Sequence, residues 1–477
     1  MRRSILLLAL LAAGAPRALP AQARDTVNLT LEAALTRALA ESDEVRLAES
    51  EVRLARTQVT AARSGALPQL SANLAYTRTF QSPFGGGGAF TLPDSLRFSP
   101  DSTASLAERV AYLERNAPLA GLAGIGGLFS GLPFGQENTY TATLSGSQLL
   151  YSGGRTGAAL SIARDYTAAA QLGLAERRAE IELQVRNAYT QAQLAQELAG
   201  FARAALQQAE AFLAQEQLRL RAGEGSELEV LRAQVSRDNL RPQLVQATNA
   251  AELALLELKR LLDLPLDQPL RLTSPLDAPQ EAEAALTAAE ATAGRASIAA
   301  AERQVAIREQ QIRIARGAFL PSVSVQAHYG RQLQPSSVFG FDEASRGDAA
   351  ATLAVQVPIF NGGQRTAELA QARIEAERAR LQLSQLRAGV QLQYEQSRGE
   401  AERARTAIAA RQTTVQAAQR VYDLTVLRYQ RGLATQLEVS QSRLELLQAR
   451  SNLAQATADL RIATARVRRA TAGAVAP

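Results

Sequence analysis

The sequence predicts a mainly α-helical protein with a small β part, in which a long helical hairpin occurs twice. Three observations indicate this fold. A double-glycine turn that precedes a long helical pattern occurs at 152–156 and again at 361–366, and a glycine interrupts each pattern about 70 residues later. From Gly153 to Gly362 is 209 positions, and from Gly223 to Gly432 is also 209. Four shorter stretches alternate between apolar and polar residues, as strands do. Two supersecondary units therefore repeat in register.

Composition excludes several classes of function. The 477 residues include no cysteine, one histidine and one methionine, which excludes a disulfide framework, a thiolate metal site and a cysteine nucleophile. No apolar run reaches the roughly 18 residues of a membrane-spanning helix. The net charge of +6 is spread along helical stretches as mixed arginine and glutamate, which predicts solvated helix faces and not a nucleic-acid surface. We expect no catalytic residue, no metal site and no cofactor.

The first 23 residues have the pattern of a secretion signal. Arg2 and Arg3 precede an apolar run at 5–13, and the small residues at 21–23 fit a cleavage site. We expect the mature chain to begin near Arg24 and to be exported.

Two helices are predicted to end at a Leu-Pro pair, one over 24–66 and one over 284–320. Pro68 and Pro321 lie just past these ends. Proline cannot continue a helix, and it disfavours the helical conformation of the residue before it. These two helix-to-strand junctions are the first sign that the β part is also duplicated.

Four strands are predicted, two over 67–151 and two over 321–360. In the first, Leu70, Ala72, Leu74 and Tyr76 share one face; in the third, Val323, Val325, Ala327 and Tyr329 do so. The fourth is expected over 351–359. His328 lies on the polar face and should line a lumen, and a metal role is not expected for it.

The first strand pair carries an insertion of about 44 residues relative to the second, within a loop over 81–138. We expect a short helix at 102–115. The apolar stretch 121–134 is interpreted as an external loop; a pore plug or receptor surface is the alternative.

The two long hairpins are predicted over 152–262 and 361–472. Apolar and alanine positions recur every three to four residues from Ile181 to Leu213, which is the spacing of knobs-into-holes packing. The helices 226–262 and 284–319 are expected to pack along 155–221, and the helices 435–472 and 30–66 along 365–431. Pro242 should kink its helix.

Four amphipathic strands cannot close a membrane barrel alone, because the smallest such barrels have about eight. An open strand edge is not tolerated in hydrocarbon. The strands must therefore pair between chains or lie outside a membrane. Export and the alternating pattern favour pairing between chains.

The duplicated order of strands, glycine turns and helices resembles the TolC-like outer-membrane efflux proteins, also called outer membrane factors, over nearly the whole mature chain. The residues that carry the resemblance are the helix–strand junctions, the strand–helix turns and the tip turns: Pro68, Pro321, Gly153, Gly154, Gly362, Gly363, Gly223 and Gly432. The resemblance implies a homotrimer with a twelve-stranded transmembrane β-barrel and a periplasmic α-barrel. It also implies an exit duct for a tripartite efflux pump or a type I secretion system.

The resemblance also implies partners and a location. The partners are outer-membrane lipid, a periplasmic adaptor (membrane fusion) protein and an inner-membrane pump, with no nucleic acid. The first copy would follow a signal peptide (1–23) and comprise an N-terminal periplasmic helix (24–66), strands 1 and 2 (67–151) and a first hairpin (152–262). A mid-tunnel linker (263–283) would lead to the second copy, with a periplasmic helix (284–320), strands 3 and 4 (321–360), a second hairpin (361–472) and a tail (473–477). The tip glycines would cap helices and contact the adaptor.

A periplasmic gate is implied at the hairpin tips. Tyr429 matches the family's latch tyrosine, and Glu438 matches the first of two pore-lining acids. Gln441 stands where the second acid is usual, and Ala434 where a basic residue is usual. Glu229 and Glu438 also fit capping boxes with Ser226 and Thr435. Capping alone, or capping together with an acidic ring at the constriction, both explain them.

Two other classes of protein share part of the pattern. A soluble periplasmic coiled-coil adaptor would have the hairpins but should lack four strands with an apolar face. A secreted enzyme would need a nucleophile–base pair or a metal cluster, which a chain with one histidine and no cysteine hardly provides.

Overall fold

The computed structural model describes residues 26–80, 101–129, 137–277, 287–335, 337–339 and 345–471. The predicted signal segment and the C-terminal tail lie outside these residues. The chain forms two compact units. The helical unit comprises Met1–Ala55, Thr167–Val305 and Ala379–Pro477, and the sheet unit comprises Arg56–Tyr166 and Ala306–Arg378. Among the described residues, no helix combines the length and apolarity needed to cross a membrane.

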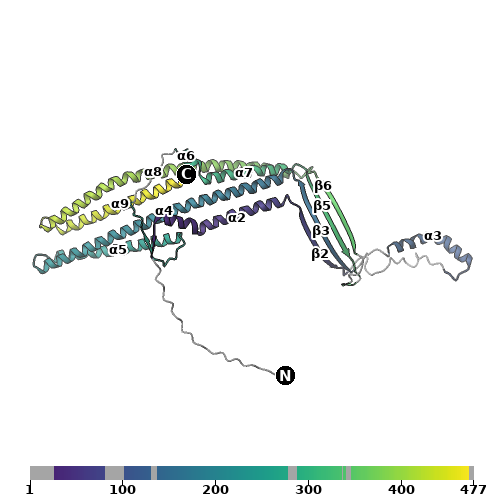
Figure 1. Ribbon diagram of the computed structural model, residues 1–477, viewed down its shortest axis with the longest axis horizontal. Coiled ribbons are helices and arrows are strands. Elements are labelled where there is room, and N and C mark those ends of the chain that lie inside the picture. Colours follow the sequence, from purple (N-terminus) through teal and green to yellow (C-terminus); the bar gives the residue numbers. More distant parts are fainter. Residues whose placement is uncertain are drawn as a thin grey trace, which may run out of the picture. The chain divides into compact units, whose positions relative to one another are not determined.

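The repeat predicted from the glycines is confirmed by the four longest helices (Figure 1). The first hairpin consists of α4 (Arg155–Arg221) and α5 (Glu227–Leu261), and the second of α8 (Gln364–Gln430) and α9 (Gln436–Ala470). The outgoing helices have 67 residues each and the returning helices 35 each. Each boundary in the second copy lies at the position expected from the 209-residue shift.

The N-terminal segment is not one helix, as predicted, but three elements. It contains β1 (Val27–Leu29), α1 (Leu31–Glu41) and α2 (Asp43–Ser64). At the break, the Ser42 hydroxyl accepts a hydrogen bond from the Glu44 amide at 3.3 Å, so Ser42 caps α2 instead of continuing α1. The Asp263 carboxylate accepts a further bond from the Asp43 amide at 3.1 Å. Periodicity alone does not reveal this competition between a cap and a continuous helix.

The linker after the first hairpin contains a strand that was not predicted, β4 (Leu270–Leu272), which pairs in parallel with β1. The Tyr189 hydroxyl of α4 donates to the Leu29 carbonyl at 2.9 Å and fixes this small sheet on the helix. The helix expected over 284–320 is also divided, into α6 (Ala288–Ala293) and α7 (Ala296–Gly317).

The expected packing of 284–319 along 155–221 is confirmed at both ends of α7: Gly317 lies against Gly153, and Arg295, just before α7, lies 3.6 Å from Glu176. The packing expected for 30–66 along 365–431 was wrong. In the helical unit, α4 packs against α1 and α2: a core cluster contains Ala34, Ala38 and Val45 together with Ile181, Val185, Tyr189 and Leu258. On the other side, α8 is bonded to α7 through Arg387 and Glu302 at 2.6 Å. The reason is the strand order, because an antiparallel hairpin places the helices at its two ends side by side. The shorter helix next to each strand pair therefore packs on the outgoing helix of its own copy.

The sheet unit contains β2 (Gln69–Arg78), β3 (Asn138–Tyr151), β5 (Ser322–Leu333) and β6 (Arg346–Gln356). They form an antiparallel sheet in the order β2-β3-β5-β6. The last strand lies about five residues earlier than predicted: it ends before Pro358, which has no amide hydrogen to donate to a ladder. The helix of the insertion, α3 (Leu106–Phe129), is longer than the predicted 102–115.

The predicted seams are buried to different degrees. In the first, Ile181, Val185, Ala192, Ala199, Ala209 and Leu213 are all buried. In the second, Val390, Tyr394 and Ala401 are buried, whereas Arg411, nearer the tip, is exposed. The second hairpin thus relies less on its own seam toward the tip.

Candidate functional site

The strand register places the predicted apolar residues on one continuous face. Leu74 lies opposite Ala142 across β2 and β3, and Val325 lies opposite Leu353 across β5 and β6. Residues directly opposite each other point to the same side of a sheet, so the four apolar stripes join. Leu70, Leu74 and Leu353 are between 64% and 81% exposed. A broad apolar sheet face is therefore open in a single chain.

The opposite face of the sheet is polar, and His328 lies on it as predicted. Its Nε2 is 2.8 Å from Oδ2 of Asp348 on β6. On the same face, the hydroxyls of Ser71 and Ser145 are bonded at 2.7 Å across β2 and β3. Alternation of an apolar and a polar face is the pattern of a strand with lipid on one side and a lumen on the other.

Tyrosines stand at one end of the apolar face. The Tyr76 and Tyr140 rings lie 4.8 Å apart between centroids, and the Tyr76 hydroxyl donates to Asn138 at 2.9 Å. Tyr329 accepts from Arg331 at 3.1 Å. Rings with an apolar body and a bonded hydroxyl are typical of the level where lipid meets water.

Both strand–helix turns use left-handed glycines: Gly153 and Gly154 have φ values of 65° and 81°, and Gly362 and Gly363 of 67° and 89°. The first turn also needs a close backbone approach, because a Cβ on Gly153 would lie 2.5 Å from the Gly317 carbonyl oxygen. Both turns follow a strand in the sheet unit and begin an outgoing helix.

The two hairpin tips have the same backbone construction. At the first, the Glu224 amide donates to Arg219 at 2.9 Å and the Gly223 amide to Leu220 at 3.1 Å. At the second, Leu433 donates to Arg428 and Gly432 to Tyr429 in the same pattern. These are Schellman motifs with a left-handed glycine. The structural role predicted for Gly223 and Gly432 as helix caps is confirmed.

Both predicted capping boxes form. The Ser226 amide donates to the Glu229 carboxylate at 3.4 Å, and the Thr435 amide to the Glu438 carboxylate at 2.5 Å. The Thr435 hydroxyl adds a bond to Glu438 at 3.0 Å. The backbone and hydroxyl bonds from Thr435 lower the pKa of Glu438. The glutamates therefore cap helices.

Tyr429, the predicted latch residue, joins the two hairpins inside the helical unit. It is buried, and its hydroxyl donates to Oε1 of Glu216 on α4 at 2.6 Å. The Tyr429 hydroxyl oxygen in turn accepts from Nη1 of Arg219 at 2.8 Å. Burial and the bond to Glu216 raise the pKa of Tyr429, so the phenol stays protonated and donates. Gln441, by contrast, is exposed and bonds only Glu445 of its own helix, at 3.3 Å.

An amphipathic sheet and two capped helical hairpins, joined by a hydrogen-bonded tyrosine, are the features to compare with known proteins. The outer membrane efflux protein family matches residues 115–263 and 280–473. The chain belongs to the outer membrane efflux protein family. No curated protein sequence matches it.

Solved structures of low sequence identity share the fold of this efflux protein. VceC from Vibrio cholerae is 19% identical, with a TM-score of 0.70 and 93% and 96% of the two chains covered. The open-state MtrE channel from Neisseria gonorrhoeae is 20% identical, with a TM-score of 0.73 and 93% and 89% covered. The CmeC channel from Campylobacter jejuni is 15% identical, with a TM-score of 0.72 and 93% and 86% covered.

Family membership decides between the functional alternatives. The efflux protein is an exit duct in the outer membrane, with its long helices in the periplasm. The soluble adaptor is not supported. Proteins of this family are channels and not enzymes, and they work as trimers with an adaptor and an inner-membrane pump.

The sequence did not reveal the partners of Tyr429. Glu216 is 1% exposed and lies 213 positions before Tyr429. Beyond it, the Phe212 ring is 5.5 Å from the Tyr429 ring, and the Arg443 guanidinium is 5.7 Å from the Phe212 ring. Arg219 lies 5.5 Å from the Tyr429 ring, so Arg443, Phe212, Tyr429 and Arg219 form a continuous row of contacts. The available signal in the sequence was Arg219, which follows Glu216 by three residues near the end of the helix that lies opposite Tyr429.

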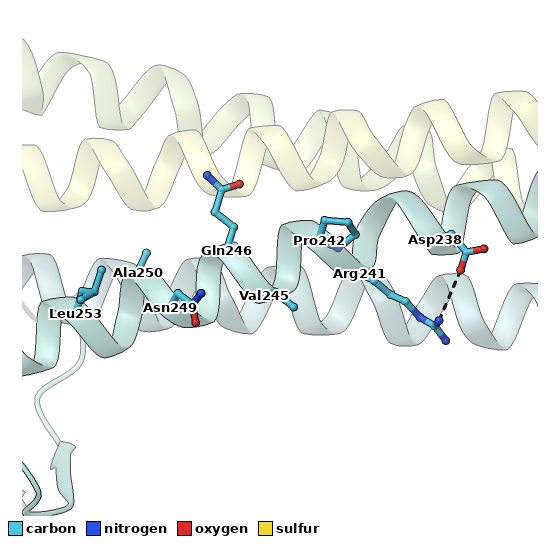
Figure 2. Close-up of a pocket in the computed structure, with 8 residues that line it drawn as sticks. All are labelled: Asp238, Arg241, Pro242, Val245, Gln246, Asn249, Ala250 and Leu253. Carbon is cyan, nitrogen blue, oxygen red and sulfur yellow. Dashed lines mark ion pairs between the residues drawn. The ribbon is translucent and has the colours of Figure 1, made fainter.

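An open groove of about 870 Å³ runs along α5 of the efflux protein (Figure 2). Its lining comes from α5 alone: Asp238, Arg241, Pro242, Val245, Gln246, Asn249, Ala250 and Leu253. Pro242 lies within the continuous helix α5, and the kink at this position stays a prediction. Val245 and Leu253 are 60% and 67% exposed, so the described part of the chain leaves this apolar strip of α5 largely uncovered.

Proposed function

We propose that three copies of this chain assemble into one efflux duct in which their sheets join into a twelve-stranded barrel. The observation that carries the proposal is the sheet itself: β2 and β6 are edge strands, and every residue of both is exposed. Unpaired edges and a wide apolar face are stable in a bilayer only when the ladder closes. If β6 of one copy pairs with β2 of the next, both edges are paired and the apolar face surrounds the closed barrel.

The long helices support the same assembly. Leu231, Val235, Val245 and Leu253 on α5 are all more than half exposed. Such apolar strips on a long helix favour packing against another helix. We propose that the α5 groove receives a helix of the neighbouring copy, so that the helices of three copies form a periplasmic tunnel.

The tips would serve as the gate and as the docking site for the periplasmic adaptor and the inner-membrane pump. The Tyr429–Glu216–Arg219 contact is proposed to hold the second hairpin against the first. It supplies the charged pair that Gln441 and Ala434 lack in the family's usual positions. We propose that Glu229 and Glu438, which cap their helices, also form acidic rings at the constriction. Catalysis, metal and nucleic-acid binding have no part in the proposal.

Cysteine cross-linking tests the assembly, because the chain has no cysteine of its own. Ala72→Cys on β2 would be combined in turn with Ala351→Cys, Leu353→Cys and Val355→Cys on β6. At least one combination should give disulfide-linked dimers and trimers in outer membranes. Leu144→Cys on the central strand β3, combined with the same β6 variants, is the control and should give none. The closed barrel would be contradicted if none of the β2–β6 combinations gave a disulfide-linked product.

A further inference from the structure

A buried cluster of charged residues joins α4 to α9 in the helical unit. Arg469 of α9 donates from Nη2 to Oε1 of Glu176 at 2.7 Å and from Nε to Oε2 of Glu180 at 3.3 Å. The Arg469 side chain is 6% exposed. A buried guanidinium is costly unless its N–H groups are hydrogen-bonded, so each nitrogen of Arg469 needs an acceptor.

Arg295, just before α7, extends the cluster. Its Nη2 lies 3.6 Å from Oε1 of Glu176, and its Nη1 donates to Oε1 of Gln393 on α8 at 2.9 Å. Burial would raise the pKa of Glu176, but the hydrogen bond and charge of Arg469 and the charge of Arg295 lower it. Glu176 is therefore a carboxylate, and its charge is taken up by these two arginines.

One part of Arg469 is not bonded within the protein. Its Nη1 is buried and has no hydrogen-bond acceptor among the described residues. A buried donor without an acceptor costs roughly 1–3 kcal/mol, and native proteins rarely leave one. The atom thus calls for an acceptor that the chain itself does not provide.

A small cavity of about 30 Å³ lies beside this side chain. It is lined by Ala179, Glu182, Leu183, Arg186, Ala465, Arg468 and Arg469. A water-sized occupant needs roughly 10–15 Å³ by this measure, so the cavity holds one small species and is too small for a phosphate. Its lining carries three arginines and one glutamate, and Glu182 is bonded to Arg186 at 2.7 Å.

We infer that this cavity is a binding site for one small monovalent anion of the halide class, with Nη1 of Arg469 as the principal donor. Charge-assisted hydrogen bonds to an anion are about twice as strong as those to a neutral acceptor, so an anion satisfies the unbonded Nη1 better than water does. The anion would complete the bonding of Arg469 and hold α9, the last helix of the second hairpin, on α4 of the first.

Crystals of the detergent-purified full chain, soaked in sodium bromide, test the site directly. We expect an anomalous bromide peak within hydrogen-bonding distance of Arg469. Arg469→Lys keeps a cation for Glu176 but has no second guanidinium nitrogen, so the peak should disappear. Arg466→Lys is the control: Arg466 pairs with Glu400 at 2.7 Å and does not line the cavity, and the peak should remain.

Thermal unfolding provides a second readout. The Tm should be higher in sodium chloride than in sodium gluconate of equal ionic strength, for the unmodified chain and for Arg466→Lys. This difference should vanish in Arg469→Lys, since binding to the folded state alone raises the Tm. An ordered water in the cavity without a bromide peak, or equal Tm values in the two salts, would overturn the inference.

Discussion

At the first hairpin tip, a carboxylate that water cannot reach is held by a tyrosine of the other hairpin. Glu216 is 1% exposed, and the Tyr429 hydroxyl and the Arg219 guanidinium are its neighbours, at 2.6 and 3.5 Å. A buried carboxylate is tolerated when it is paired and hydrogen-bonded, and it becomes costly when one partner is removed. The pairing of this buried carboxylate with α8 therefore depends on the Tyr429 hydroxyl, whereas the Phe212–Tyr429 ring contact does not.

Tyr429→Phe should loosen the tip without disturbing the ring contacts. The variant keeps the contact with Phe212 but removes the bond to Glu216, which we expect to cost about 1–3 kcal/mol. The measurement is single-channel conductance in planar bilayers, where open events should become more frequent. Tyr422→Phe, two helical turns earlier on α8, is the matched control. Equal opening in both variants would rule out a latch role for Tyr429.

Glu438→Gln separates the cap from the charge. Glutamine also completes a capping box, so trimer yield should match the unmodified protein, whereas Glu438→Ala should lower it. Reversal potentials then show whether the carboxylates line the pore: a fall in cation preference with Gln would establish the constriction role, and an unchanged value would leave only the cap.

The lowered pKa of Glu438 predicts that the stability of the second hairpin tip depends on pH. The folded pKa of Glu438 is below its ordinary value of 4.5. Its contribution to stability is therefore present above about pH 4.5 and is lost as the pH falls through the lower folded pKa. Proteolytic nicking at 430–436 should increase with acidification in this range, and Glu438→Gln should remove that increase. The same acid response in both proteins would argue against this assignment.

Among single residues, the sequence identified those whose role follows from local backbone geometry. Capping boxes and left-handed glycines are legible because their partners lie three to six residues away. Glu216 and Arg443 were missed because their partners lie on other helices, where only the tertiary packing brings them together. Tyr429 was found through the family resemblance and not through its spacing.

At the scale of elements, the two strand–helix turns give a matched pair of glycines. Gly153→Ala adds a Cβ 2.5 Å from the Gly317 carbonyl, whereas Gly362→Ala meets nothing within 4 Å. Both variants pay the left-handed penalty of roughly 1–2 kcal/mol. We expect the yield of assembled protein in outer membranes to fall further for Gly153→Ala, and equal yields would show that the close approach to Gly317 is not essential.

The two faces of β5 should differ in their tolerance of charge. Val325→Arg places a cation on the apolar face and should cost roughly 2–4 kcal/mol near the bilayer midplane, so the heat-stable assembled form should be depleted on gels. Ser324→Arg, on the polar face, should assemble and change the conductance. If both variants assemble equally well, this strand does not face lipid.

Element positions were predicted well where a single periodicity extends over many residues, as in α4 and β5. They were predicted poorly where elements compete or where pairing is distant. The break at Ser42 depends on a cap and on Asp263 from another segment. The β1–β4 pair has only three residues a strand, too few for alternation to be recognised. The partner of the N-terminal helices was assigned wrongly by matching lengths, because the hairpin connection from β2 to β3 places them on α4.

For the whole molecule, the expected state is a trimer. Native mass spectrometry of the detergent-purified protein should give a mass of three chains, because four strands leave two open edges in each copy. Replacing the exposed apolar strip on α5 by Val245→Asp and Leu253→Asp should shift the protein toward monomer, while Asp238→Asn, in the same groove, should not. A stable monomer of the unmodified chain would contradict the assembly.

The equal lengths of the two copies restrict how such a chain changes in evolution. Outgoing helices of 67 residues and returning helices of 35 residues occur twice. A residue inserted in one arm would rotate everything beyond it by about 100° and would turn Tyr429 or Glu216 away from its partner. Length changes are therefore tolerated only as matched additions of about seven residues in every arm. The helix lengths therefore set the length of the duct, and a longer or shorter duct requires coordinated length changes in all four long helices.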